Sequence, residues 1–191
     1  MPDYTMDILG KRLNSTDEEL MEGEIMENQA KVDPLKPNEV RFVELSAMRV
    51  VSCKAFSNSP ENDAIEKMSD WVKKHNIEAF PYMRYFGFNN PNPAEGKSEY
   101  GYEIWVTVPD TIEEKDLDEG FEFKETQAGL YAVTSTSYDN FDVGERWHML
   151  WEWVQASEYE MGKNQWLEEH ISPRYLWDAG KLQLDLYVHI V

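Results

Sequence analysis

The pattern of hydrophobic and polar positions becomes regular at Val40 and predicts a first group of elements. The stretches VRFVEL and MRVVSCKAF are rich in β-branched and aromatic residues, which is typical of strands. Apolar residues then recur at spacings of three and four over residues 64–72, which predicts an amphipathic helix capped by Asn62. YMRYFGF and YEIWVTVP follow as strands, so the order is strand, strand, helix, strand, strand.

A second group of elements repeats the first. YEIWVTV begins at residue 102 and the similar LDLYVHI at residue 184, a difference of 82, and Glu44 matches Glu125 at 81. FEFKET, LYAVTSTSY and NQWLEEHI read as the other strands, and a helix is expected from about Asp142. Its predicted apolar face consists of Val143, Trp147, Leu150, Trp151 and Val154. The chain therefore contains an internal repeat, residues 40–108 and 121–190.

The repeat predicts how the domain is organised. One helix cannot cover four strands, so a single copy leaves apolar surface exposed, and two copies related by an approximate two-fold axis would bury it. Trp105 and Tyr187 should then occupy positions related by that axis. Because ligand cavities often form at the joint between related halves, we expect function to lie between the repeats.

Residues 1–39 differ in character from the rest. They contain ten acidic residues against four basic ones and end in DPLKPN, whose prolines interrupt regular structure. A capping box of Thr16 and Glu19 predicts a short helix at about residues 17–29. We therefore expect a partly helical acidic arm over residues 1–39 and one domain over residues 40–191.

Composition and charge exclude several classes of function. With 18 basic and 37 acidic residues the net charge is −19, which opposes direct nucleic-acid binding and favours cationic or neutral small molecules. The single cysteine, Cys53, cannot form an internal disulfide. No signal peptide or membrane span is evident, so a cytoplasmic protein is expected. The four histidines lie at no metal-ligand spacing, and no cofactor motif is present, so we expect neither a metal nor a cofactor.

Aromatic and acidic residues form the strongest candidate site. Side chains alternate in a strand, so Trp166, Glu168 and His170 share one face, which meets either solvent or the cavity between the repeats. In an aromatic-walled cavity the charge of Glu168 would be costly to desolvate, and an organic cation would remove that penalty. Alternatively, such a pocket would raise the pKa of this carboxyl and suit it to general acid–base catalysis.

These residues resemble a known family. GLYAVTSTSYDNFDVGERWHMLWEWV, WLEEHI and the terminal LDLYVHIV are similar to the GyrI-like small-molecule-binding domain, which is also the effector-binding half of multidrug-sensing transcription regulators. The resemblance covers residues 40–191. It implies an α+β fold, a tandem duplication of a β-α-β-β module with a mostly antiparallel sheet of about eight strands, two main helices and a cleft between the repeats.

The resemblance also implies roles for individual residues. The family's Gly-x-Tyr strand entry falls on Gly129 and Tyr131, its helix tryptophan on Trp147 and its ligand-sensing acid on Glu168. His170 stands where the family often has tyrosine. Residues 1–39 are too short and too acidic for the helix-turn-helix domain of the regulators, so direct DNA binding is not expected.

Three functions remain open from the sequence. The first is binding of aromatic, cationic or neutral hydrophobic small molecules, for sequestration or sensing. Its expected ligand-binding residues are Glu168, His170, Trp166, Phe88, Tyr102, Trp105, Tyr138, Trp147 and Trp151. The second is hydrolysis of cyclopropane-type, DNA-alkylating toxins by Glu168 and a tyrosine, with Tyr102 the first candidate before Tyr138 and Tyr131. It is implied by the stretch YFGFNNP…YGYEIW, which resembles a stand-alone branch of the family. The third is inhibition of a DNA enzyme such as gyrase through a protein contact of the acidic arm. The sequence leaves monomer and dimer open.

Overall fold

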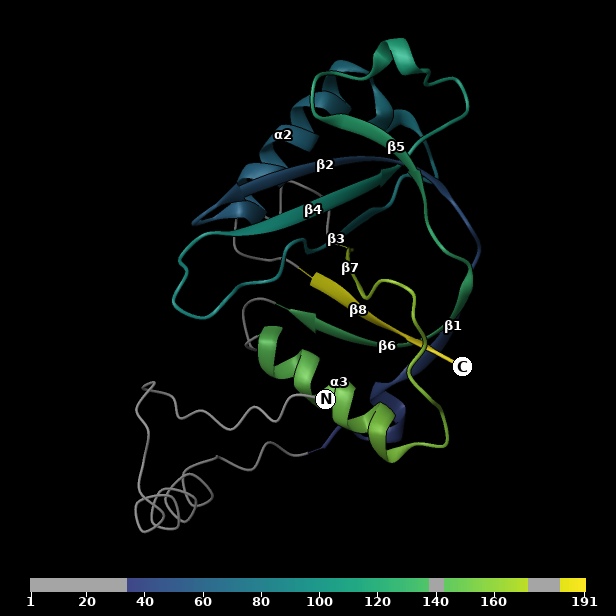
Figure 1. Cartoon of the computed structure of the whole chain (residues 1–191). Helices are drawn as coiled ribbons and strands as arrows, with labels where there is room; N and C mark the ends of the chain where they lie inside the picture. Colours follow the sequence, from purple (N-terminus) through teal and green to yellow (C-terminus); the bar gives the residue numbers. More distant parts are fainter. Residues whose placement is uncertain (1–33, 138–142, 172–182) are drawn as a thin grey trace. The chain divides into compact units, whose positions relative to one another are not determined.

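A computed structural model describes residues 34–137, 143–171 and 183–191 of the chain (Figure 1). The predicted arm helix at residues 17–29 and the candidate Tyr138 lie outside these residues. The strands of the described part are β1 (Arg41–Leu45), β2 (Arg49–Ser57), β3 (Tyr85–Asn89), β4 (Tyr100–Thr107), β5 (Phe121–Glu125), β6 (Gly129–Ser137), β7 (Leu167–His170) and β8 (Gln183–Ile190). The helices are α2 (Pro60–Lys74) and α3 (Val143–Ala156), with short 3-10 helices η1 (Pro37–Glu39), η2 (Ile77–Ala79) and η3 (Glu114–Asp116). Neither α2 nor α3 is long and apolar enough to cross a membrane.

The strands form one antiparallel sheet in the order β1-β6-β8-β7-β3-β4-β2-β5, which confirms the predicted fold class. If each strand is replaced by its counterpart in the other repeat, the same order is obtained in reverse, so the sheet has an approximate two-fold axis between β3 and β7. The first strands are exchanged, because β1 pairs with β6 and β5 pairs with β2. β1 and β2 are consecutive in sequence but lie far apart in the sheet (Figure 1).

The strand register agrees with the predicted relation between Trp105 and Tyr187. Trp105 lies opposite Phe86 on β3, and Tyr187 lies opposite Leu167 on β7. Phe86 and Leu167 are 81 residues apart, and Trp105 and Tyr187 are 82 residues apart, so both pairs hold corresponding places in the two repeats. The connection between β1 and β2 and the corresponding connection between β5 and β6 are hydrogen-bonded to each other near the axis. The backbone N–H of Thr126 donates to the carbonyl of Met48 at 2.9 Å.

Helix α2 begins earlier than the sequence pattern predicted. Ser59 is its N-cap residue and Pro60 occupies the first turn, where the missing N–H of proline costs nothing, so Asn62 lies inside the helix and not at its cap. Acidic residues in the first turn and lysines in the last turn favour this helix electrostatically. The predicted apolar face is largely confirmed, with Ala64, Met68, Trp71 and Val72 buried.

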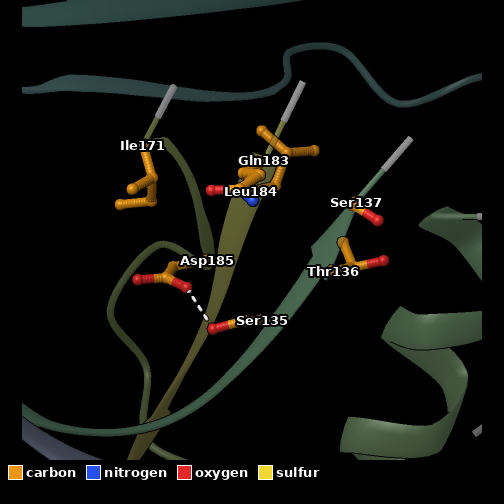
Figure 2. Close-up of a pocket in the computed structure, with 7 residues that line it drawn as sticks. All are labelled: Ser135, Thr136, Ser137, Ile171, Gln183, Leu184 and Asp185. Atoms are coloured by element: carbon orange, nitrogen blue, oxygen red, sulfur yellow. Dashed lines mark hydrogen bonds between the residues drawn. The ribbon is translucent and has the colours of Figure 1, made fainter. Parts of the chain in front are cut away.

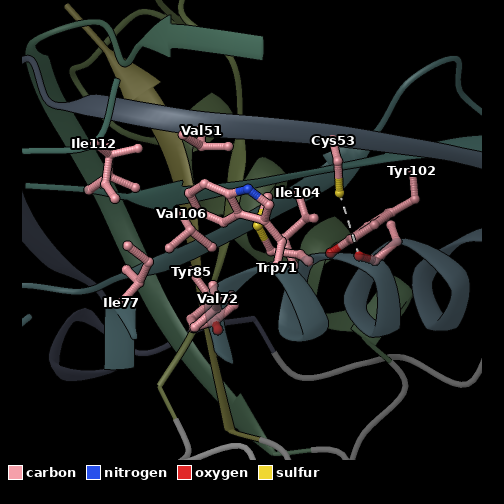
Figure 3. Packing of buried hydrophobic residues seen from close by; sticks show 13 residues of the cluster. Val51, Cys53, Trp71, Val72, Ile77, Tyr85, Tyr102, Ile104, Val106 and Ile112 are labelled. Atoms are coloured by element: carbon pink, nitrogen blue, oxygen red, sulfur yellow. Dashed lines mark hydrogen bonds between the residues drawn. The ribbon is translucent and has the colours of Figure 1, made fainter. Parts of the chain in front are cut away.

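The face of α2 packs on β2 and β4 in a continuous apolar cluster (Figure 3). Trp71 lies at its centre, and its indole N–H donates to the carbonyl of Asp116 at 3.0 Å. Cys53 belongs to the same cluster and is 1% exposed, and this burial raises the pKa of its thiol to about 12. Tyr102 also packs here, so this core reaches the site described below.

Helix α3 buries a narrower stripe than its sequence predicted. Met149, Leu150 and Val154 are buried, whereas Trp151 is 41% exposed and stacks on His148. Trp151 was expected on the apolar face because its spacing fits the helical period, but the helix packs mainly on the adjacent strands β6 and β8 and leaves Trp151 on its exposed side. The ring of Trp153 instead contacts the half-exposed Phe42 on β1.

Candidate functional site

Glu168 lies beside the two-fold axis of the sheet, directly opposite Gly87. One carboxylate oxygen accepts a hydrogen bond from the Tyr102 hydroxyl at 2.9 Å, and the other accepts one from the Trp147 indole N–H at 3.0 Å. Tyr102 packs with the α2 cluster, and Trp147 belongs to α3. Both helices therefore lie on the sheet face of Glu168, and this carboxylate joins elements of both repeats.

Gly87 provides the space that this arrangement needs. A β-carbon at this position would lie 1.9 Å from the Tyr102 hydroxyl oxygen, so the tyrosine ring occupies the volume of the missing side chain. Gly87 and Glu168 are 81 residues apart and hold corresponding places in the two repeats. One repeat thus contributes a carboxylate at the axis, and the other contributes room for a tyrosine that binds it.

The surroundings of Glu168 favour either a protonated, uncharged carboxyl or a carboxylate paired with a bound cation. Burial raises its pKa, nearby Glu61 adds to this, and the hydrogen bonds from Trp147 and Tyr102 only partly oppose it. Burial and the adjacent carboxylate likewise raise the pKa of Tyr102 well above its ordinary value. Within the part of the chain that the structure describes, Glu168 has no salt bridge with a basic side chain. The ionised form is therefore stabilised by hydrogen bonds and not by a counterion.

A second tyrosine–glutamate pair lies next to the first. Tyr100 precedes Tyr102 by two residues on β4 and so faces the same side of the sheet. Its hydroxyl donates to Glu61 of α2 at 2.6 Å, and this bond raises the pKa of Tyr100 to about 12. Glu61 was not identified from the sequence, because an acid in the first turn of a helix is ordinary there.

A pocket of about 390 Å³ lies at Glu168. It is lined by Phe88, Asn89, Asn92, Trp147, Lys163, Asn164, Gln165, Trp166 and Glu168. The rings of Trp147 and Trp166 stack at 5.7 Å between centroids with an interplanar angle of 18°. Residues of both repeats therefore line this pocket. Its main chemical features are two indoles, one carboxylate and the exposed basic side chain of Lys163, which forms no ion pair with Glu168 in the described part of the chain.

The structure brings most of the expected site residues together. Glu168, Trp147, Trp166 and Phe88 line the pocket, and Tyr102 bonds to Glu168. The His170 Nε2 lies 3.3 Å from the Tyr102 hydroxyl, so His170 adjoins the same pair.

Two expected residues lie apart from the pocket. Trp105 is on the opposite face of the sheet, because it pairs with Phe86, whose neighbour Gly87 faces Glu168. Its indole N–H donates to Glu103 at 2.5 Å. Trp151 is on the outer side of α3 and is not among the lining residues. We therefore leave Trp105 and Trp151 out of the candidate site.

The acidic residues of the opposite sheet face have partners. Glu103 is 1% exposed and accepts hydrogen bonds from Ser52, Asn90, Trp105 and Lys124. Burial would raise the pKa of Glu103, but the bonds from Lys124 and these groups outweigh it and lower the pKa to about 2. Glu169 binds Arg84 through both oxygens at 2.6 and 2.7 Å. These acids stabilise the fold, which distinguishes them from Glu168.

A second pocket, of about 460 Å³, lies where β6 ends and β8 begins (Figure 2). It is lined by Ser135, Thr136, Ser137, Ile171, Gln183, Leu184 and Asp185. The Ser135 hydroxyl donates to Asp185 at 2.6 Å, and Asp185 also forms an ion pair with Arg41. Its carboxylate is thus neutralised, and none of the described residues that line this pocket is aromatic, so they lack the chemistry of the Glu168 site.

The antiparallel sheet of eight strands with two helices is that of a GyrI-like effector-binding domain, and the resemblance found in the sequence is confirmed. The chain belongs to the family described as integron-associated effector binding protein, whose model matches residues 41–190. Nearly all described residues fall within this match.

Individual proteins with a similar sequence or fold are more distant. A DNA gyrase inhibitor from Escherichia fergusonii is 26% identical over 129 residues, which cover 66% of this chain and 79% of that protein. EcmrR, in a cryo-EM structure of its DNA complex, has a TM-score of 0.58 at 13% identity, and the match covers 92% of this chain but only 64% of EcmrR. SAV2435, solved bound to tetraphenylphosphonium, has a TM-score of 0.50 at 11% identity, with 80% of this chain and 94% of that chain covered. These two structural similarities show the fold alone.

Proposed function

We propose that this protein binds aromatic organic cations in the pocket at Glu168 and thereby sequesters or senses them. The observation that supports this most directly is a carboxylate that no basic side chain of the described residues neutralises, in a pocket that the stacked indoles of Trp147 and Trp166 also line. Membership of an effector-binding family supports a small-molecule ligand in general.

The chemistry of the pocket favours a cation over an anion. Burial raises the pKa of Glu168, which means that the protein stabilises its charge poorly, and a bound cation would supply the missing counter-charge. Each indole can add about 0.5–2 kcal/mol through a cation–π contact. The volume of about 390 Å³ is within the usual range for small-molecule sites. SAV2435, which shares the fold, was solved with such a cation.

Two ions of nearly equal size and opposite charge test the proposal. Isothermal titration calorimetry should detect tetraphenylphosphonium binding to the full chain and should detect little or no binding of tetraphenylborate. Glu168→Gln should weaken tetraphenylphosphonium binding by roughly tenfold or more, because it removes the opposite charge at close range. Glu66→Gln is the matched control, since it removes one exposed acid from α2 outside the pocket. Equal binding of both ions, or no effect of Glu168→Gln, would refute the proposal.

The hydrogen bond between Tyr102 and Glu168 supports a second candidate, hydrolysis of strained electrophiles. Glu168 would take a proton from water while the water oxygen attacks a carbon of a cyclopropane conjugated to a carbonyl. The ring C–C bond breaks, its electron pair moves to the carbonyl oxygen, and the Tyr102 hydroxyl binds that oxygen. A raised pKa makes Glu168 a better base near neutral pH.

Turnover separates this candidate from simple binding. A cyclopropane-bearing electrophile incubated with the protein should give more moles of ring-opened product than moles of protein. Tyr102→Phe should lower the rate and leave tetraphenylphosphonium binding within about twofold of the original. Product that stops at one equivalent rules out an enzyme.

A further inference from the structure

One wall of the Glu168 pocket is a segment held against the last strand. Residues 160–166, here called the wall segment, supply Lys163, Asn164, Gln165 and Trp166 to the pocket lining. At its start, Glu160 and Val191 exchange backbone hydrogen bonds of 3.0 and 2.9 Å. The Gly162 N–H then donates to the carbonyl of His189 at 2.8 Å. The wall segment therefore takes its position from the end of β8.

The side chain of His189 makes the next contact along the wall segment. The backbone N–H of Asn164 donates to the His189 Nδ1 at 3.2 Å, so the neutral ring carries its proton on Nε2. Two glycines make room for the ring. A β-carbon at Gly162 would lie 1.7 Å from Nδ1, and one at Gly129 would lie 2.6 Å from Nε2. Such close packing indicates that the imidazole has a defined position and a defined partner.

His189 has no contact with the pocket itself. It lies on the opposite face of the sheet from Glu168, because it alternates with Val188 and Leu186, and Leu186 pairs with Glu168. It can affect a ligand only through the wall segment, in which it holds Asn164, a residue that lines the pocket. Asn164 is also tied through its side chain to the carbonyl of Ala128 at 3.1 Å, so the imidazole is one of several anchors.

We propose that His189 is a positioning residue for the candidate site, holding the wall segment in its ligand-binding arrangement only while Nδ1 is unprotonated. A protonated ring has N–H groups at both nitrogens, so Nδ1 can no longer accept from Asn164, and two donors then face each other. Acid would loosen the wall segment and weaken ligand binding. This inference rests on the proposed function for its effect on ligands, but its effect on Asn164 is independent of any ligand.

The surroundings of His189 favour the neutral ring. Its titratable neighbours are Tyr131 on β6, in ring contact at 5.2 Å, Tyr187 on β8, and Glu160 and Lys163 in the wall segment. Glu160 and Lys163 are exposed, and the Tyr187 hydroxyl is bonded to Glu169. Burial lowers the pKa of His189 from 6.5, and the side chain is only 9% exposed.

The sign of the pH effect follows from this direction. Since the folded protein disfavours the protonated ring, the contribution of His189 to stability is present above pH 6.5 and is lost as the pH falls through the lowered pKa.

Amide hydrogen exchange of Asn164, followed by NMR in the full chain without ligand, tests the mechanism. After correction for intrinsic rates, its protection should fall on going from pH 7.5 to a pH below the lowered pKa of His189. His189→Asn places an amide oxygen near the former Nδ1 and does not titrate, so it should keep Asn164 protected at both values. His189→Leu removes the acceptor and should lower protection at both values by roughly three- to tenfold, the equivalent of one hydrogen bond. His148→Asn, at an exposed histidine of α3, is the control.

Tetraphenylphosphonium affinity at pH 7.5 tests the link to the site. His189→Asn should bind within about twofold of the original protein, and His189→Leu should bind roughly three- to tenfold more weakly. If the original protein fails to bind this cation, the proposed function fails, while the exchange result still decides the role of His189. If His189→Leu does not fold, the role of His189 is decided by comparing how Asn164 protection depends on pH in His189→Asn and in the original protein. Asn164 protection that is independent of pH, or that falls equally in His189→Asn, overturns the inference.

Discussion

Replacement of Gly87 by alanine should disrupt the candidate site from the opposite strand. The new β-carbon would lie 1.9 Å from the Tyr102 hydroxyl oxygen and 2.5 Å from the ring carbon that bears it. Tyr102 is only 2% exposed, so its ring is enclosed by neighbouring groups that would have to shift with it. Overpacking costs about 1–3 kcal/mol, and loss of a hydrogen bond to a carboxylate costs about 1.5–3 kcal/mol. We expect a loss of about 3–5 kcal/mol in the free energy of unfolding.

Thermal unfolding measures this loss. For a domain of this size each kcal/mol corresponds to about 2–4 °C, so the midpoint should fall by roughly 6–20 °C. A double-mutant cycle with Tyr102→Ala identifies the cause. Once the ring is removed, Gly87→Ala should lower the free energy of unfolding by less than about 1 kcal/mol, because Gly87 has an ordinary strand conformation that alanine can adopt. An equal cost in both backgrounds would show that Tyr102 is not the reason for the glycine.

Two further predictions concern acids of opposite character. Burial raises the pKa of Glu168, so above pH 4.5 the folded chain binds more protons than the unfolded chain and loses stability as the pH rises. Glu168→Gln should therefore raise the thermal midpoint at pH 7.5, with a gain that shrinks toward pH 4.5; a gain independent of pH would contradict this. Hydrogen bonds lower the pKa of Glu103 to about 2 despite burial. The contribution of Glu103 to folding stability is therefore present above pH 4.5 and is lost as the pH falls toward 2. Glu103→Gln should lower the free energy of unfolding, measured with urea at pH 7, by roughly 3–5 kcal/mol. An unchanged urea midpoint would show that the negative charge of Glu103 does not stabilise its hydrogen-bond partners.

The sequence predicted the repeated modules but not how their strands pair. Periodicity identifies strands and helices within one stretch of chain, and the offsets of 81 and 82 relate the two stretches. Nothing in that pattern indicates that β1 joins β6 and that β5 joins β2, because alternation records which face a residue occupies and not which strand lies beside it.

The candidate site was likewise predictable from the sequence only in part. Glu168 could be selected from strand alternation and from the family resemblance. Glu61 could not, since its proximity to Glu168 arises only when α2 packs on β4. Trp105 was placed in the site for its aromatic character, but its register puts it on the other face of the sheet. Gly87 carried no signal at all, because its role depends on the ring of a residue on the neighbouring strand.

The exchange of β1 and β5 has a consequence for the order in which the protein can fold. Arg41 pairs with Val133, which the ribosome adds 133 − 41 = 92 residues later. During synthesis β1 therefore has no partner, and the edge of β2 stays open until β5 is made. Long-range pairing of this kind slows folding and leaves strand edges open to association with other chains. Expression of residues 40–108 alone should consequently give an aggregating fragment, although that stretch contains every element of one repeat.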